Sequence, residues 1–182
     1  MDHRDHVALL YPANLPVGGN WADLGAGSGA FTLALRDLVG GEAEVYAIDR
    51  DRSRLGELER AWRLRFGDTT RLHLLPADFT GPLELPALDG IVMANSLHYY
   101  KDKEKVLRHI SSFLKPGGRL LLVEYNVDSG NLWVPYPLSF ETFKALTVRA
   151  GFEAPRWLGT HPSSFMRSFY SAEAIFNTKD TK

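Results

Sequence analysis

The residues best suited to chemistry lie in a glycine-rich segment, Asp23 to Gly29, which reads Asp-Leu-Gly-Ala-Gly-Ser-Gly. The segment falls between a short apolar run and a stretch with helical spacing, which is where parallel sheets bind ligands. Glycines there let the backbone turn sharply and approach a ligand closely. The segment also fits the dinucleotide pattern G-x-G-x-x-G/A, with Ala30 in the last place. A nicotinamide cofactor therefore competes with a second kind of ligand.

Three aspartates, each near the end of an expected strand, discriminate between these ligands. Asp23 would repel a pyrophosphate but attract an ammonium or sulfonium group. Asp49 follows Gly25 by 24 residues (49 − 25) and can accept hydrogen bonds from both ribose hydroxyls. Asp78 can accept a hydrogen bond from an adenine amino group, while Phe79 packs against the ring. Together these residues outline an adenosine with a cationic tail.

Alternating strand and helix patterns would position these residues. Short apolar runs predict strands, which cover Gly19–Leu24, Val45–Ile48, Arg71–Leu75, Leu88–Ala94, Arg119–Tyr125, Pro155–Gly159 and about Met166–Ile175. Apolar residues at helical spacing predict helices over Ala30–Val39, Ser53–Phe66, Lys103–Leu114 and Ser139–Ala150. Strands separated by helices indicate βαβ units in a mostly parallel sheet. Since no helix separates the last two strands, we expect them to form an antiparallel pair at one edge.

Composition and charge exclude several classes of protein. The chain has 182 residues, 45% hydrophobic and 24% charged, which is typical of one globular domain. No apolar run reaches the roughly 18 residues of a membrane span, and no secretory signal is visible. The absence of cysteine excludes disulfides and thiolate chemistry, and a net charge of −1 does not favour nucleic acid. We expect a cytoplasmic single domain over residues 1–182, with a lid segment at 1–18 and a core at 19–176.

The order and spacing of these motifs resemble class I S-adenosylmethionine-dependent methyltransferases. The matching segments are Asp23–Gly29, Asp49, Ala77-Asp78, Leu88–His98, Leu114–Leu120 and Ala150-Gly151-Phe152. The resemblance extends from about Asn20 to Phe176. It implies an α/β, Rossmann-like three-layer sandwich with a seven-stranded, mostly parallel sheet of order 3-2-1-4-5-7-6, in which strand 7 is antiparallel. It also implies S-adenosylmethionine as the cofactor.

The resemblance assigns residues to each part of that cofactor. Asp23 would lie near the amino group of the methionine moiety, which would lie along Gly25, Ala26, Gly27, Ser28 and Gly29. Asp49 would hold the ribose with Arg50 beside it, and Asp78 and the Phe79 backbone would bind the adenine. Asn95 would lie under the sulfonium and face the substrate.

Methyl transfer needs a base only where the acceptor must lose a proton, because the methyl carbon is already activated. His98 follows the fourth expected strand, and an imidazole suits proton transfer near neutral pH. It is therefore the candidate catalytic residue. The alternative is that it packs or caps the next helix. No metal is expected, since His3 and His6 could share a helix face but lack a third ligand.

Several acceptor classes lack the residues that they need. The segment Asn95-Ser96-Leu97-His98 departs from the N-P-P-Y pattern of amino-group methylation, and Met93–Tyr100 holds no acid for magnesium or a polyamine. A small molecule or a protein side chain remains. Aromatic residues near the same edge predict a small-molecule substrate wall of Tyr99, Tyr125, Trp133 and Tyr136. The pocket could be open, closed by Asp2–Pro16, or completed by a second chain in a homodimer.

Three functions compete at this point. The first is methyl transfer from S-adenosylmethionine to an unidentified small molecule by in-line displacement. The second is a non-catalytic cofactor-binding module or partner subunit with the same fold. The third is an NAD(P)-dependent oxidoreductase, against which Asp23 and Asp78 argue.

Overall fold

The computed structural model describes residues 1–177 and contains a seven-stranded sheet of order β3-β2-β1-β4-β5-β7-β6. The strands are β1 (Asn20–Leu24), β2 (Glu44–Asp49), β3 (Leu72–Pro76), β4 (Leu88–Ala94), β5 (Leu114–Tyr125), β6 (Arg156–Pro162) and β7 (Ser168–Ile175). The α-helices are α1 (His3–Leu10), α2 (Ala30–Val39), α3 (Arg52–Phe66), α4 (Lys103–Ser111) and α5 (Phe140–Arg149). β7 runs antiparallel to both β5 and β6, and the other pairs are parallel. The predicted sheet order and antiparallel edge are confirmed.

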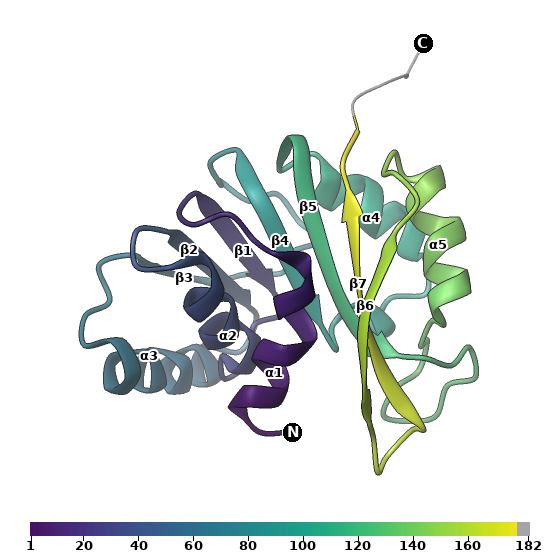
Figure 1. Cartoon of the computed structure of the whole chain (residues 1–182), viewed down its shortest axis with the longest axis horizontal. Helices are drawn as coiled ribbons and strands as arrows, with labels where there is room; N and C mark the ends of the chain where they lie inside the picture. The colour runs from purple at the N-terminus through teal and green to yellow at the C-terminus, as the bar shows by residue number, and fades with distance from the viewer. Residues whose placement is uncertain (178–182) are drawn as a thin grey trace.

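The sheet is the middle of three layers, because its strands bury side chains on both faces (Figure 1). Along β4, Ile91 and Met93 pack with α4 and α5, whereas Val92 points to the other face and packs with α1, α2 and α3. All three side chains are fully buried. This alternation explains why the parallel strands read as continuous apolar runs in the sequence.

The predicted helix over Lys103–Leu114 is wrong at its C-terminal end. The helix α4 stops at Ser111, and Leu114 instead begins β5, where it pairs with Leu88 of β4. The pairing then jumps to Gly90 with Arg119, so the Lys-Pro-Gly-Gly segment forms an irregularity within the strand rather than a separate loop. Pairing with β4 was decisive here, and helical spacing cannot reveal it.

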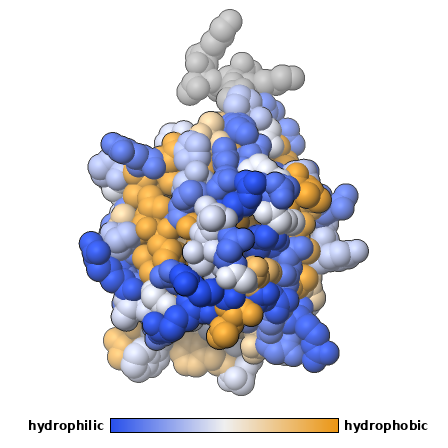
Figure 2. All heavy atoms as spheres, turned by 90° about the vertical axis from the view of Figure 1, so that its left-hand side faces the viewer, coloured by the Kyte–Doolittle hydropathy of each residue, from blue (hydrophilic) through white to orange (hydrophobic). Residues whose placement is uncertain are grey.

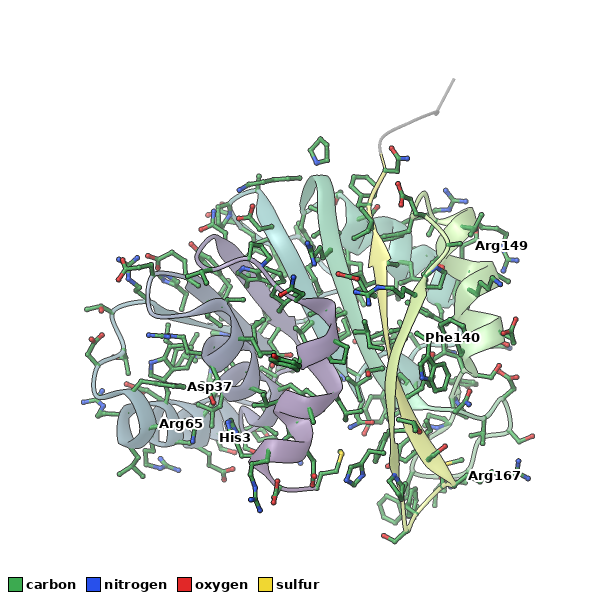
Figure 3. The ribbon with its side chains drawn as sticks, viewed as in Figure 1. His3, Asp37, Arg65, Phe140, Arg149 and Arg167 are labelled. Atoms are coloured by element: carbon green, nitrogen blue, oxygen red, sulfur yellow. The ribbon has the colours of Figure 1, made fainter. Side chains whose placement is uncertain are left out.

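The N-terminal segment forms a helix that sequence reasoning did not assign. Asp2 accepts the backbone N–H of Asp5, and the Asp5 side chain accepts the backbone N–H of Asp2, so a capping box begins α1. His3 Nε2 lies 2.7 Å from Asp37 Oδ2 of α2, to which Arg65 Nη2 of α3 donates at 2.6 Å. Figure 3 shows these three side chains side by side. They tie α1 to the helices beside it.

Two arginines hold the other end of this segment. Arg119 Nη1 donates to the carbonyl of Ala13 at 2.9 Å, and Arg156 donates to that of Pro12 at 3.1 Å. Both guanidinium groups also pair with the buried Glu173 of β7, at 2.9 and 2.7 Å. The segment predicted as a lid is thus anchored at both ends.

Within residues 1–177, no helix combines the length and apolar character needed to span a bilayer.

The β3 edge of the sheet carries charged side chains. Arg71 donates to Glu42 Oε2 at 2.8 Å and to Glu44 Oε1 at 2.6 Å, and His73 lies 2.8 Å from Glu44 Oε2. Figure 2 views the molecule from this side and shows hydrophilic residues over much of the face. Charged side chains beside an edge strand oppose its pairing with another chain.

A glycine at the β1–β4 contact provides a test of this packing. A Cβ added at Gly90 would lie 2.2 Å from Cζ3 of the buried Trp21. We expect Gly90→Ala to lower the free energy of unfolding by about 1–3 kcal/mol through overpacking. Gly56→Ala in α3 is the matched control, because its Cβ would approach only Arg60 Nη1, at 3.8 Å. It should raise stability by about 0.5–1 kcal/mol. Urea titrations of both variants measure the difference, and equal stabilities would contradict this account.

Candidate functional site

A cavity of about 460 Å³ opens at the carboxyl ends of β1, β2, β3 and β4. This volume lies in the usual range for small-molecule sites. Its lining combines residues at and after these strand ends with residues from α1, from the starts of α2 and α3, and with Met1. The lining residues are Met1, His6, Asp23, Gly25, Ala26, Gly27, Ser28, Ala30, Phe31, Asp49, Arg50, Asp51, Arg54, Ala77, Asp78, Phe79, Ala94, Asn95, Ser96, Tyr99 and Tyr100.

The glycine loop is fixed by backbone hydrogen bonds to β2. The N–H groups of Gly25 and Ala26 both donate to the carbonyl of Ile48, at 2.8 and 3.0 Å. Gly25 has a φ of +84°, and a Cβ there would lie 2.5 Å from Ser96 Cβ. At Gly27, with a φ of +54°, a Cβ would meet only Arg54 Nη1, at 3.6 Å. The loop is therefore tight on its β4 side and open toward the cavity.

Gly29 has a packing role in this structure. It precedes α2 with a φ of +92°, and a Cβ there would lie 2.5 Å from Leu58 Cγ of α3. It is outside the described cavity lining, unlike the four other loop residues predicted to lie along the methionine moiety.

Asp23 reaches the cavity from the end of β1 and is only 1% exposed. Burial raises the pKa of its carboxyl to about 7; the hydrogen bond from Thr32 Oγ1, 2.6 Å from Oδ2, opposes this shift, and the negative charge of Asp49 adds to it. Within residues 1–177 no cationic side chain pairs with this carboxyl. A cationic ligand group would therefore meet a buried carboxyl group that has no cationic partner within the described protein.

Asp49 connects the glycine loop to the start of α3. Its Oδ2 accepts the N–H of Gly27 at 2.8 Å, and its Oδ1 accepts that of Asp51 at 2.9 Å. Each carboxylate oxygen has a second lone-pair direction, so a diol can still bind the same group.

Asp78 and Phe79 form the adjacent wall of the cavity. Burial raises the pKa of the Asp78 carboxyl, but hydrogen bonds from Thr80 and the charge of Arg50 outweigh it and hold the pKa below its usual value. Arg50 Nη1 lies 3.6 Å from Asp78 Oδ2. The Phe79 ring is buried and meets the Tyr100 ring edge-on, with centroids 5.2 Å apart.

Asn95, at the end of β4, combines strain with an unpaired polar atom. Its φ of +53° lies in the left-handed region, which is uncommon for a residue with a side chain. Its Oδ1 is buried without a hydrogen-bond partner among the described residues, although the residue lines the cavity. A strained residue with an unpaired oxygen at a cavity indicates a ligand contact.

The predicted aromatic wall lies mainly outside the cavity. Of its four residues, Tyr99 lines the described cavity and is 56% exposed. Tyr125 packs against Phe169, with centroids 4.3 Å apart, and Trp133 is 71% exposed. Tyr136 is also exposed, and its ring lies 5.6 Å from Lys103 Nζ. Tyr99 follows β4, whereas Tyr125, Trp133 and Tyr136 lie at or after the end of the neighbouring strand β5, so we call these four residues the rim.

His98 is buried next to this rim rather than in the described cavity lining. It is 2% exposed, and its Nδ1 lies 2.8 Å from Oε2 of Glu124 on β5. Glu124 is fully buried, and its Oε1 accepts the backbone N–H groups of Leu97 and His98 at 3.1 and 3.2 Å. Glu124 was not among the residues predicted from the sequence. The signal was an acidic residue inside the most apolar strand, where charge is rarely found.

Other lining residues also escaped sequence reasoning. Arg54 lies on the first turn of α3, five positions after Asp49, and this proximity could have revealed it. His6 comes from α1 and Met1 from the residues just before it, and His6 packs against Phe31 with ring centroids 4.8 Å apart. Only the docking of α1 onto α2 brings these residues to the site.

Comparison with known proteins agrees with this geometry. Residues 22–120, more than half of the chain, match the family model for a methyltransferase domain. The chain belongs to this methyltransferase family. A curated relative is the ubiquinone/menaquinone biosynthesis C-methyltransferase UbiE of Burkholderia mallei, which is 27% identical over 175 residues, covering 95% of this chain and 67% of the relative.

Solved structures share the fold. The YcgJ protein of Bacillus subtilis superposes with a TM-score of 0.78 at 14% identity, covering 96% of this chain and 99% of that one. Magnesium protoporphyrin IX methyltransferase of Synechocystis PCC 6803, solved with bound S-adenosylmethionine, gives 0.73 at 20% identity, covering 96% and 78%. This protein is a class I S-adenosylmethionine-dependent methyltransferase. Its unpaired Asn95 oxygen, its buried Asp23 and the open face of Gly27 fit that cofactor.

Replacing Asp49 tests the placement of the ribose. Asp49→Ala removes charge-assisted hydrogen bonds worth about 1.5–3 kcal/mol each and releases the Gly27 N–H. We expect the affinity for S-adenosylhomocysteine, measured by calorimetry, to fall by roughly tenfold or more per lost bond. Asp68→Ala is the control, since Asp68 holds only an exposed turn through Thr70. Unchanged affinity in Asp49→Ala would show that the ribose lies elsewhere.

Replacing Asp23 tests the cost of its burial. The folded-state pKa of about 7 exceeds the ordinary value of 3.8, so the folded protein binds a proton that the unfolded chain releases between these values. The contribution of Asp23 to stability therefore falls as pH rises from about 4 to 7, by on the order of 2–4 kcal/mol. The neutral Asp23→Asn variant lacks this loss. Without cofactor, it should be more stable than the wild type at pH 8, and the advantage should disappear near pH 4.

The control for that comparison is Asp89→Asn. Burial raises the pKa of the Asp89 carboxyl, but hydrogen bonds from the Lys115 side chain and the Asn20 backbone outweigh it and hold the pKa below its usual value. The ionised form of Asp89 therefore stabilises the fold. Its replacement should lower stability at pH 8. Denaturant titrations across pH measure both variants, and a parallel response of the two would contradict the assignment.

Proposed function

We propose that this methyltransferase acts on a small, largely apolar acceptor that enters past Tyr99. The observation that carries the proposal is the continuity of the cavity with the aromatic rim: Tyr99 lines the cavity, and its ring lies 4.3 Å from that of His98, which in turn lies 6.1 Å from the Tyr125 ring. Aromatic side chains beside a polar cavity suit an acceptor with an apolar body and one reactive polar end. The name of the UbiE relative, which refers to quinone biosynthesis, is consistent with such an acceptor.

In this proposal the three aspartates hold the cofactor and the rim holds the acceptor. Asp23 binds the amino group of the methionine moiety, while Gly25, Ala26, Gly27 and Ser28 allow close approach of the chain. Asp49 binds the ribose with Arg50 beside it, and Asp78 and the Phe79 backbone bind the adenine. Asn95 Oδ1 faces the sulfonium, where its partial negative charge is attracted to the cationic group.

The bound cofactor supplies a methyl carbon activated for in-line displacement. The protein contributes orientation, because an aligned acceptor lowers the barrier by avoiding the entropy loss of a bimolecular encounter. Tyr99, Tyr125, Trp133 and Tyr136 would exclude water from the acceptor and set its direction of approach. The predicted homodimer and closure of the site by residues 1–18 stay predictions.

Cofactor titration tests the assignment. We expect calorimetry to show micromolar binding of S-adenosylhomocysteine and no binding of NADH. Binding of NADH alone would make the protein an oxidoreductase. A stable S-adenosylhomocysteine complex without methylation of any apolar phenol, quinol or enol would favour the second reading, a non-catalytic cofactor-binding module.

Replacement of a rim residue tests the acceptor side. Trp133→Ala should raise KM for the acceptor, because it removes apolar area at the entrance, and it should leave affinity for S-adenosylhomocysteine unchanged. Leu64→Ala is the control, since Leu64 is also a large, exposed apolar side chain but lies on α3, outside the described rim and cavity. A KM unchanged by Trp133→Ala would remove this residue from the acceptor site.

A further inference from the structure

The methionine moiety of the cofactor carries a carboxylate that the contacts proposed above leave without a partner. Acids dominate those contacts: Asp23 faces the ammonium group, Asp49 the ribose and Asp78 the adenine, and all three line the cavity. Like charges repel each other, most strongly where water is excluded, so a carboxylate that enters among these acids needs a cationic partner. The cationic side chains of the same cavity are the candidates.

The described lining contains three such side chains, His6, Arg50 and Arg54. Both arginines already face a carboxylate of the protein. Arg50 Nη1 lies 3.6 Å from Asp78 Oδ2, at the proposed adenine end, and Arg54 Nε lies 3.8 Å from Asp51 Oδ2. His6 is the remaining candidate, and it comes from a different element, the helix α1.

The ring of His6 differs from the other imidazoles of the protein. The chain has six histidines, and the other five each have a ring nitrogen that lies 2.7 to 3.0 Å from a carboxylate or carbonyl oxygen; these are His3, His73, His98, His109 and His161. Within residues 1–177, neither ring nitrogen of His6 has a hydrogen-bond or ion-pair partner. Both nitrogens are therefore available to a ligand in the cavity.

The neighbours of His6 place it at the amino-acid end of the cavity. Its ring packs against Phe31 of α2, with centroids 4.8 Å apart. The next residue, Thr32, donates a hydrogen bond from Oγ1 to Asp23 at 2.6 Å. Asp23 is the proposed partner of the ammonium group, and an amino acid carries its ammonium and carboxylate groups on the same carbon. The partner of the carboxylate should thus lie at the Asp23 end, to which α1 brings His6.

The surroundings of His6 favour the neutral ring in the free protein. Burial lowers the pKa of His6 below its usual value, and the positive charges of the amino terminus and of His3 lower it further, against the opposing charges of Asp5 and Asp2. The aspartates and arginines named above share the cavity with His6 from other elements. An anionic ligand group beside the ring would favour its protonated form and so raise this pKa.

We propose that protonated His6 binds the carboxylate of the methionine moiety, and that the helix α1 thereby selects a cofactor that carries this carboxylate. The inference rests on the placement of the cofactor in the proposed function. A hydrogen bond between charged groups is stronger than one between neutral groups, so the contact depends on the proton. The pKa of His6 is then higher in the complex than in the free protein, and the preference for the carboxylate is lost as pH rises through the pKa of the complex.

Two ligands that differ in one group isolate this contact. S-adenosylhomocysteine has the carboxylate, whereas decarboxylated S-adenosylhomocysteine keeps the ammonium group, the ribose and the adenine. Calorimetry of the full chain at pH 6 gives the ratio of the two affinities. We expect the wild type to prefer S-adenosylhomocysteine, and His6→Gln to reduce this preference by roughly tenfold or more. A preference that His6→Gln leaves unchanged overturns the proposal.

The pH dependence of the same ratio is independent of Asp23. Both ligands carry the ammonium group, so the titration of Asp23 affects them alike and cancels in the ratio. The wild-type preference should be greater at pH 6 than at pH 8, while that of His6→Gln should be the same at both. NMR of the histidine rings, with the His6 signal assigned by its loss in His6→Gln, should show a higher pKa in the complex with S-adenosylhomocysteine than in that with the analogue. Equal pKa values in the two complexes overturn the proposal.

A second histidine of α1 provides the matched control. His3 pairs with Asp37 of α2 outside the described cavity lining, as Figure 3 shows for the pair. His3→Gln weakens the attachment of α1 but keeps the His6 ring. It should change the affinity for both ligands by the same factor and leave their ratio unchanged. A ratio that falls in His3→Gln as it does in His6→Gln would assign the effect to the position of α1 and overturn the proposal.

Arg54→Gln tests the competing partner. We expect it to leave the ratio unchanged, because Arg54 already faces Asp51. Loss of the preference in Arg54→Gln but not in His6→Gln would assign the carboxylate to Arg54 and overturn the proposal. A wild type that binds neither ligand contradicts the proposed function as well, whereas binding of both ligands with a ratio independent of His6 contradicts this inference alone.

Discussion

The pairing of β1 with β2 is the constraint on which the site depends. Because the two strands run parallel, the backbone that leaves β1 can donate two N–H groups to one carbonyl, that of Ile48, before it turns into α2. The next N–H, from Gly27, is accepted by Asp49 at the end of β2. The sheet therefore holds the glycine loop in its conformation before any ligand binds. Such preorganisation reduces the entropy lost on binding.

This arrangement has a cost in stability, and the cost is concentrated in two residues. Asp23 is buried without a cation, which raises the pKa of its carboxyl to about 7, and Asn95 is held in the left-handed region with an unpaired oxygen. Neither feature helps the free protein to fold. Both make sense if a cationic group occupies the cavity, which is the general conflict between stability and function at binding sites. The cofactor should therefore stabilise this protein by more than its contact area suggests.

The acceptor side follows a different principle. The cavity near the cofactor is polar and closely defined by backbone, whereas the rim around Trp133 and Tyr136 consists of exposed aromatic side chains on an irregular loop. Between them lies the rigid pair of His98 and Glu124, fixed by two backbone N–H groups. A rigid buried pair thus lies beside exposed aromatic side chains that can adjust to different apolar groups.

The sequence by itself determined the order of strands and helices, the glycine loop and the three aspartates, because each depends on residues that are close in the chain. Apolar periodicity and strand-end polar residues are local signals, and the parallel sheet then aligns Asp23, Asp49 and Asp78 at one edge. Resemblance to a known family supplied the sheet order and the cofactor. Pairing of β4 with β5 moved the end of α4, which a local pattern could not show.

Only the tertiary structure decided the rest. Met1 and His6 enter the cavity because α1 is tied to Asp37 and, through Pro12 and Ala13, to two arginines more than a hundred residues away. Glu124 meets His98 because β4 and β5 are neighbours, although 26 residues separate the two side chains. The same packing placed Trp133 and Tyr136 at a rim instead of inside the cavity. Such contacts join distant segments through burial and geometry, which residue types and their spacing along the chain do not encode in any local pattern.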